Sequence, residues 1–112
     1  MNIANYDSFL AIADPHRREI LMMLSKEKLP MNSIADRFDI SRPAISRHVR
    51  VLHATGFIDI EEKGRERICM LNQAGFNEIQ DWMDHFEKYW ISQLQSLDEF
   101  LKKNESINNK KE

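Results

Sequence analysis

The segment best suited to chemistry runs from residue 42 to residue 53 and reads RPAISRHVRVLH. It contains three arginines, two histidines and no acidic residue. Arginine pairs with the O6 and N7 atoms of guanine, and serine contacts either bases or phosphates. The segment therefore favours nucleic acid as a partner, and a solvated basic face without specific contacts is the alternative interpretation.

A helix over this segment divides its residues into two faces, because successive side chains are 100° apart. One face, which we expect to be buried, holds Ile45, His48, Val49 and Leu52. The other face, which we expect to meet solvent or a ligand, holds Pro43, Ser46, Arg47 and Arg50. Ser41 is the expected N-cap of this helix and Gly56 marks its end.

Three shorter helices are predicted before the basic helix. The first covers residues 6–13, and the second starts with Asp14 as N-cap and Pro15 in the first helical position. The third follows Pro30 and leads to the basic helix through the turn 38–41. A tight turn of this kind needs a small residue where the helices approach, here Ala35. It also needs a residue that tolerates a left-handed conformation, here Asp39.

Alternating apolar and polar residues predict a two-stranded hairpin after the basic helix. The apolar positions are Ile58, Ile60, Ile68 and Met70. The tip carries Lys63 and Arg65, and Arg67 lies beside it. Three glutamates in the hairpin offset this positive charge, so a charge-balanced surface turn is the alternative interpretation. A basic helix followed by a basic hairpin favours a winged DNA-binding domain. In such a domain the helix enters the major groove and the hairpin extends along the duplex.

Composition is consistent with a small cytoplasmic protein that is not an enzyme. Residues 1–71 carry 11 basic against 10 acidic residues, and residues 72–112 carry 5 against 8, so positive charge is local. The sequence shows no secretory signal, no membrane span and no catalytic or glycine-rich phosphate motif. The fold class expected is mainly α with a small two-stranded β-hairpin, as a domain over residues 1–103 followed by a disordered tail over residues 104–112.

The strings ADPHRREILMML and ISRPAISRHVRVLHATGFIDIEEKGRERICML resemble the ArsR (ArsR/SmtB-type) family of winged helix-turn-helix transcription regulators. The similarity covers about residues 6–101. It implies a homodimeric repressor that binds a short palindromic operator in double-stranded DNA, with base contacts on the exposed face of the basic helix. The residues expected at the DNA are Ser41, Arg42, Pro43, Ala44, Ser46, Arg47, Arg50, Lys63, Arg65 and Arg67.

Many members of that family sense metals, and this sequence departs from their sites. Residues 31–36 lack the cysteine pair of one common site, and His85 is the only histidine in the last helix, where another site lies. His48 and His53 are about 140° apart around their helix, and His16 is expected at the surface. We therefore expect no metal and no cofactor.

Two other functional classes are left open as alternatives. The first is a metal- or redox-responsive sensor of the same fold, for which Cys69 would need a second thiol. The second is a winged-helix module that binds protein instead of DNA. The exposed basic face of the helix over residues 42–53 argues against this module.

The last helix, predicted from Asn72 to Lys103, carries an apolar stripe that needs a partner. The stripe would extend about 40 Å at 1.5 Å per residue, further than so small a domain can cover. Packing on the core explains the part between Phe76 and Met83, and an identical chain is the commonest partner for the rest. The expected dimer interface comprises Phe9, Leu10, Phe86, Trp90, Leu94 and Leu97. An aromatic pocket for an unknown small-molecule effector between protomers is a further alternative.

Overall fold

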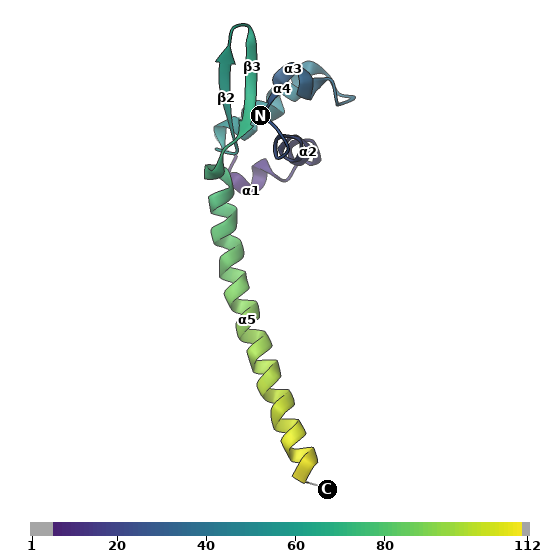
Figure 1. Ribbon diagram of the computed structural model, residues 1–112, viewed down its shortest axis with the longest axis vertical. Coiled ribbons are helices and arrows are strands. Elements are labelled where there is room, and N and C mark those ends of the chain that lie inside the picture. Colours follow the sequence, from purple (N-terminus) through teal and green to yellow (C-terminus); the bar gives the residue numbers. More distant parts are fainter. Residues whose placement is uncertain (1–5, 111–112) are drawn as a thin grey trace. The chain divides into compact units, whose positions relative to one another are not determined.

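The computed structural model describes residues 6–110, with side chains described as far as residue 105. The elements in chain order are α1 (Ser8–Ala11), α2 (Pro15–Leu24), β1 (Leu29–Pro30), α3 (Met31–Ala35), α4 (Arg42–Ala54), β2 (Ile58–Lys63), β3 (Glu66–Leu71) and α5 (Gln73–Lys110) (Figure 1). The predicted order of helices, hairpin and long helix is confirmed. The chain forms two compact units, one ending at Ile79 and the other beginning at Gln80.

Side-chain caps start the helices where the sequence predicted them. Asp14 accepts hydrogen bonds from two backbone N–H groups in the first turn of α2, at 2.8 and 3.2 Å. The Ser41 hydroxyl accepts one in the first turn of α4 at 3.2 Å, and Asn72 does the same for α5 at 2.8 Å. Each cap satisfies N–H groups that the helix itself leaves without partners.

The sheet has three strands instead of the two that were predicted. Its order is β1-β3-β2, all antiparallel, and β1 pairs Leu29 with Cys69 and Pro30 with Ile68. Two residues are too few to show an alternating pattern, so sequence periodicity could not reveal β1. The predicted hairpin of β2 and β3 is confirmed, and Gly64 provides the positive φ, 61°, at its turn.

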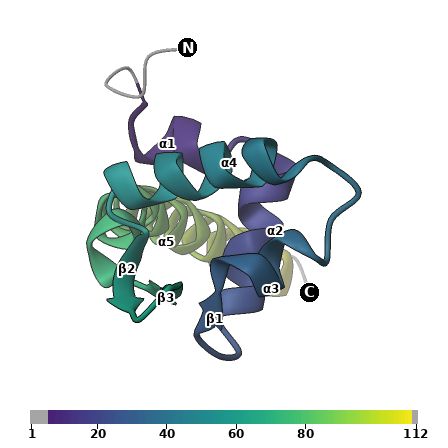
Figure 2. The ribbon, with the colours of Figure 1, turned by 90° about the horizontal axis from the view of Figure 1, so that it is seen from above.

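The core joins α2, α3, α4 and the sheet. Figure 2 shows α4 lying beside α2 and α3, with which it packs. The largest fully buried side chains are Phe57, Ile20, Ile34, Ile45, Leu52 and Ile58. Gly75 lets the start of α5 approach Phe57, because a Cβ at Gly75 would lie 2.7 Å from the ring.

The connection between α3 and α4 differs from the predicted turn. Ala35 is buried at the helix approach, as expected. However, no non-glycine residue among residues 6–110 has a positive φ, so the left-handed conformation expected at Asp39 is wrong. The helix α3 ends at Ala35 and α4 begins at Arg42, so the chain reverses over residues 36–41 and needs no strained residue.

The long helix contributes to the core only at its start. Phe76 and Ile79 pack against the core, whereas Met83, which we expected there, is 53 % exposed. The helix also continues past the predicted end at Lys103, to Lys110. A separate tail after residue 103 stays a prediction. None of the described helices is long and apolar enough to cross a membrane.

Candidate nucleic-acid interface

Helix α4 has the two faces that the sequence predicted. Ile45, Val49 and Leu52 are fully buried, and these residues fix α4 on the core. The opposite face is exposed at Pro43, Arg47 and Arg50 and half-buried at Ala44 and Ser46. Among the described residues, no hydrogen bond or ion pair holds the guanidinium groups of Arg47 and Arg50. Both groups are therefore available to a ligand.

Arg42 occupies the first position of α4. It contacts Asn32 in α3 and Asp36, the residue directly after α3. Its guanidinium donates hydrogen bonds to the Asp36 carboxylate at 2.8 Å and to Asn32 Oδ1 at 2.9 Å. Because the pair with Asp36 is exposed on both sides, it contributes at most about 1 kcal/mol. Arg42 can therefore exchange these contacts for a phosphate at small cost. The sequence did not predict them, since they depend on the angle between α3 and α4.

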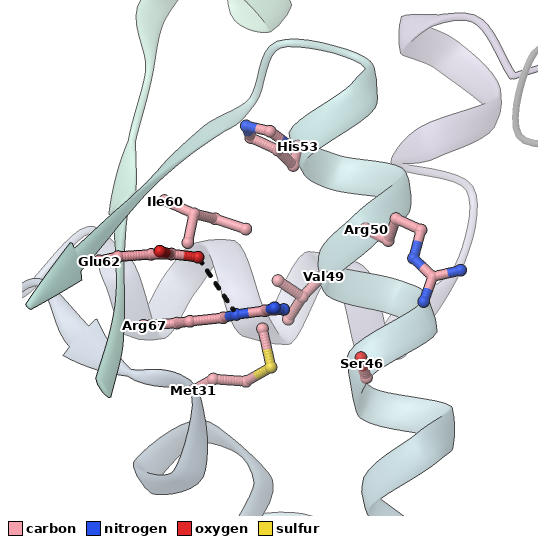
Figure 3. A pocket seen from close by; sticks show the side chains of 8 residues that line it. All are labelled: Met31, Ser46, Val49, Arg50, His53, Ile60, Glu62 and Arg67. Carbon is pink, nitrogen blue, oxygen red and sulfur yellow. Dashed lines mark ion pairs between the residues drawn. The ribbon is translucent and has the colours of Figure 1, made fainter. Parts of the chain in front are cut away.

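The hairpin brings further basic residues close to α4. A pocket between α4 and the hairpin is lined by Met31, Ser46, Val49, Arg50, His53, Ile60, Glu62 and Arg67 (Figure 3). Arg67 points across it, and its Nε lies 3.9 Å from Glu62 Oε1 on the neighbouring strand. The structure thus brings the predicted residues Ser46, Arg50 and Arg67 around one hollow. Lys63 and Arg65 are exposed near the hairpin turn and do not line it.

Arg17, which lies in the family-like string ADPHRREILMML, is a structural residue. It is 7 % exposed, and it donates hydrogen bonds to the carbonyl oxygens of Leu10 and Ala11. Its Nη1 lies 3.2 Å from Nδ1 of His48, and its guanidinium lies over the Tyr6 ring at 5.2 Å. Arg17 therefore joins the segment around α1 to α4. Its spacing of three, four and seven residues from apolar positions in α2 was the signal that it faces inward.

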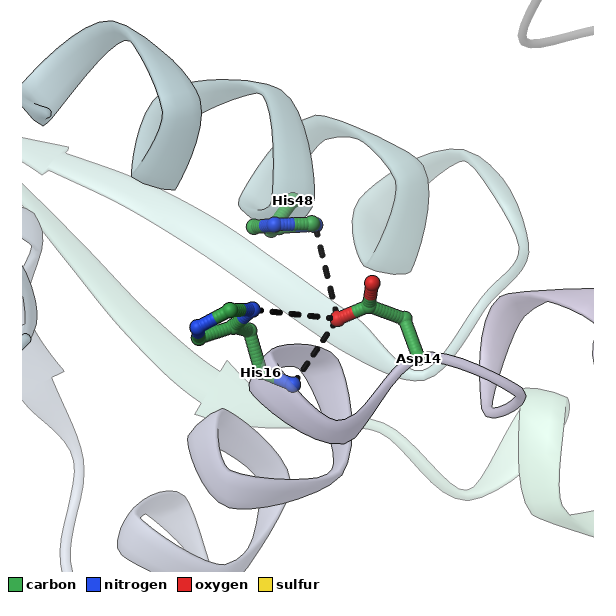
Figure 4. A group of neighbouring side chains, drawn as sticks. All are labelled: Asp14, His16 and His48. Atoms are coloured by element: carbon green, nitrogen blue, oxygen red, sulfur yellow. Dashed lines mark hydrogen bonds and ion pairs between the residues drawn. The ribbon is translucent and has the colours of Figure 1, made fainter. Parts of the chain in front are cut away.

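Asp14, His16 and His48 form a cluster beside Arg17 (Figure 4). Nδ1 of His16 lies 3.6 Å from Asp14 Oδ1, and Nδ1 of His48 lies 4.0 Å from the same oxygen. The two imidazole rings stack with centroids 5.5 Å apart. His16 also makes an edge contact with the Phe38 ring, while its side chain is 42 % exposed, as expected for a histidine at the surface.

The environment shifts the pKa values of two members of the cluster. Burial lowers the pKa of His48, and Arg17, His16 and Arg47 lower it further, which together outweigh the attraction of Asp14. Burial acts to raise the pKa of Asp14, but backbone hydrogen bonds from Arg17 and His16 and the charge of His48 bring it below its usual value. The cluster therefore holds an ionised Asp14 beside a neutral His48 at neutral pH.

The same three residues are of types that bind metal ions, but their surroundings do not fit an ion. Arginine has only hydrogen-bond donors, so Nδ1 of His48 accepts from Arg17 and cannot also bind a metal. Asp14 Oδ1 already accepts two backbone hydrogen bonds. The nearby guanidinium, which is buried and held by backbone carbonyls, would also repel a cation. The expected absence of a metal stays a prediction.

Cys69 is the residue on which the alternative of a redox sensor depends. It lies on the central strand with 0 % exposure. Burial raises the pKa of its thiol, and the charge of Arg67 opposes this only in part. A buried thiol with a raised pKa is a poor nucleophile, because the thiolate is the reactive form. The structure therefore favours a packing role for Cys69.

The exposed apolar residues of α5 form the other predicted surface. Phe86, Trp90, Leu94 and Leu97 are between 40 and 64 % exposed. In α1, Leu10 is 47 % exposed and Phe9 is half-buried. Apolar side chains of this size are rarely left in water along several turns of a helix.

Comparison with known proteins identifies the family. The family described as "Bacterial regulatory protein, arsR family" matches residues 14–59. Transcriptional repressor SdpR of Bacillus subtilis (strain 168) is 36 % identical over 78 residues, which are 70 % of this chain and 87 % of that protein. The chain belongs to the ArsR family. The resemblance found in the sequence is thereby confirmed.

Solved structures agree with the ArsR assignment. The crystal structure of ArsR family transcriptional regulator RHA00566 aligns with a TM-score of 0.70 at 30 % identity, over 74 % of this chain and 91 % of that one. The homodimeric winged helix-turn-helix DNA-binding domain of Mb0332 from Mycobacterium bovis aligns with a TM-score of 0.57 at 18 % identity. The alignment covers 69 % of this chain and 75 % of that one. The second likeness concerns the fold alone. It places α3, α4 and the hairpin of this ArsR-family chain in a winged helix-turn-helix.

Proposed function

We propose that this ArsR-family chain is a sequence-specific DNA-binding transcriptional repressor that acts as a homodimer in the cytoplasm. The observation that carries the proposal is the division of α4. Its fully buried apolar face fixes the helix, and its exposed face presents Ser46, Arg47 and Arg50. A rigid helix with unengaged arginines on one face is suited to the major groove, where arginine recognises guanine.

Within this proposal the residues divide into two classes of DNA contact. Pro43, Ala44, Ser46 and Arg47 meet base edges. The remaining predicted residues contact phosphates: Ser41, Arg42, Arg50, Lys63, Arg65 and Arg67. Phosphate contacts fix the register of the protein on the duplex, and base contacts provide the sequence preference. The hollow between α4 and the hairpin suits a phosphate, because Arg50 and Arg67 line it from opposite elements.

A second copy of the chain is the proposed partner of the exposed apolar residues. Phe86, Trp90, Leu94 and Leu97 of one protomer would be covered by its partner, together with the α1 residues Phe9 and Leu10. The support is the exposure of the α5 residues in the single chain. Two-fold symmetry then presents two α4 helices to two halves of a palindromic site.

The direct test is recovery of DNA by the purified protein from sheared genomic fragments of its source organism. We expect repeated enrichment of a few fragments that share a palindrome, and a gel shift with the enriched palindrome that its shuffled sequence does not give. As a control, Arg18→Ala removes one exposed arginine outside the proposed interface and should leave the shift unchanged. Recovery of random fragments alone would contradict the proposed function.

A further inference from the structure

The contact between Arg17 and His48 links the placement of α4 to a titratable group. His48 comes directly after Arg47 in the sequence, and its side chain is 17 % exposed. Arg17 cannot move away to relieve a change at His48, because backbone carbonyl oxygens of residues 10 and 11 hold its guanidinium. Any change at His48 Nδ1 is therefore passed to α4 and not absorbed by Arg17.

The hydrogen bond between them requires one protonation state of the imidazole. Arginine only donates, so Nδ1 of His48 must carry a lone pair and the ring must be neutral. When His48 binds a proton at Nδ1, two N–H donors and two positive charges face each other over 3.2 Å. The contact then changes from attractive to repulsive.

We propose that His48 is a positioning residue for DNA reading, which in its neutral form sets the orientation of Arg47 and Ser46 through its hydrogen bond with Arg17. Protonation of His48 displaces α4 and removes discrimination between operator and other DNA. This inference rests on the proposed function. Its consequence is a repressor whose sequence preference weakens as the pH falls below neutral.

The charged and titratable groups around His48 act in opposite directions. From α2 and its cap, Asp14 favours the proton at 4.0 Å, while Arg17 at 3.2 Å and the stacked ring of His16 oppose it. From α4 itself, Arg47 opposes it as well. Near α1, the Tyr6 ring lies under the Arg17 guanidinium, with Cζ 5.2 Å from the ring centroid. Asp14 exerts the largest of these charge effects, but burial of His48 opposes the proton more strongly, and Arg17, His16 and Arg47 add to that opposition.

Sequence preference, and not affinity alone, is the quantity that reports this effect. A proton on His48 adds positive charge, which strengthens attraction to the phosphates of every duplex. A displaced α4 weakens only the contacts to base edges. The ratio of the affinity for the recovered palindrome to that for its shuffled sequence cancels the first effect and isolates the second.

The test measures this ratio between about pH 8 and about pH 5, because burial and the neighbouring positive charges lower the pKa of His48 below the usual histidine value. In the parent the ratio should fall about tenfold, as expected when one good pairing with a base is removed. His48→Gln still offers an acceptor to Arg17 and does not titrate, so its ratio should stay high throughout. His48→Ala removes the acceptor and should have a low ratio at both ends.

The outcomes separate this inference from the proposed function. A parent that binds no DNA specifically even at the higher pH overturns the proposed function. Two results overturn the role of His48 and leave the proposed function intact. One is a parent that is equally specific at both ends of the pH range. The other is a His48→Gln variant that loses specificity with the same pH profile as the parent. Should His48→Ala fail to fold, the comparison of the parent with His48→Gln still decides. NMR titration of the His48 ring assigns the change to this residue.

Discussion

Four predicted DNA-contacting arginines of the domain differ in what already holds them. Arg47 and Arg50 have no hydrogen bond or ion pair among the described residues, whereas Arg42 pairs with Asp36 and Arg67 with Glu62. Both pairs are exposed, so breaking them on DNA binding costs at most about 1 kcal/mol each. Arg47, which is proposed to contact bases, therefore has no partner among the described residues to release before it binds DNA. Arg42 and Arg67, which are proposed to contact phosphates, are each paired with a carboxylate in the unbound protein.

Asp14 is the residue at which acid should act on stability. Its folded pKa lies below its usual value, so its contribution is complete above the unfolded pKa and is lost as the pH falls through the folded one. Asp14→Ala removes the cap of α2 and should lower the free energy of unfolding by about 1 kcal/mol near neutral pH. Urea denaturation of parent and variant should converge once the carboxyl is protonated.

The matched control for that measurement is Asp39→Ala, which removes the same charge from the exposed turn before α4. It should change the free energy of unfolding by less than about 0.5 kcal/mol. If the free energy of unfolding of Asp14→Ala stayed equally far below that of the parent in acid, the loss would come from packing and not from the ionised cap.

Faces of helices were predictable from sequence at the residue scale, and long-range pairs were not. The spacing of Ile45, Val49 and Leu52 determines which side of α4 is buried, so the exposed arginines followed directly. The contact of Arg17 with His48 joins residues 31 positions apart, and it depends on how α2 crosses α4. Periodicity within one helix contains no information on that crossing.

At the scale of elements, α4 and the hairpin have separable tasks in the proposed function. The double change Lys63→Ala with Arg65→Ala removes two exposed charges near the hairpin turn and no apolar packing. Affinity for the palindrome and for its shuffled sequence should fall alike. The slope of log affinity against log salt should become shallower by about 0.9 for each phosphate that the variant no longer neutralises.

Lys26→Ala with Lys28→Ala is the control for this change, because it removes the same charge from the exposed segment between α2 and β1. Its salt slope should match the parent's. A hairpin variant that lost affinity for the palindrome only would show that the hairpin reads bases.

Elements were predictable where local signals mark their ends. The caps at Asp14, Ser41 and Asn72 placed the starts of three helices correctly, and the alternation around Gly64 placed the hairpin. The strand β1 was not predicted, because it has only two residues and pairs with β3, which is distant in sequence. The turn between α3 and α4 was placed too narrowly, because nothing in residues 36–38 marks the early end of α3.

For the whole molecule, dimerisation is the property on which operator binding should depend. Half-sites about 34 Å apart require two α4 helices at once, so a monomer should bind poorly. Replacing Trp90 and Leu94 together by Ala removes two of the most exposed apolar side chains of α5. Sedimentation should then show monomer at micromolar concentration, with helical content retained and operator affinity reduced in parallel.

Gln93→Ala with Gln95→Ala changes two exposed residues of the same helix outside the proposed interface and should leave the dimer intact. If the Trp90 and Leu94 variant stayed dimeric and bound normally, the interface would lie elsewhere on the chain. If both double variants dissociated, the helix itself and not the apolar stripe would be responsible.

The claim that the exposed face of α4 reads DNA sequence is tested most directly by one comparison. The affinities of the parent and of Arg47→Ala are measured for the recovered palindrome and for its shuffled sequence at one salt concentration. We predict that Arg47→Ala loses about 1–3 kcal/mol on the palindrome and changes binding to the shuffled sequence little. A variant that bound the palindrome as the parent does, or that weakened on both sequences equally, would contradict the account.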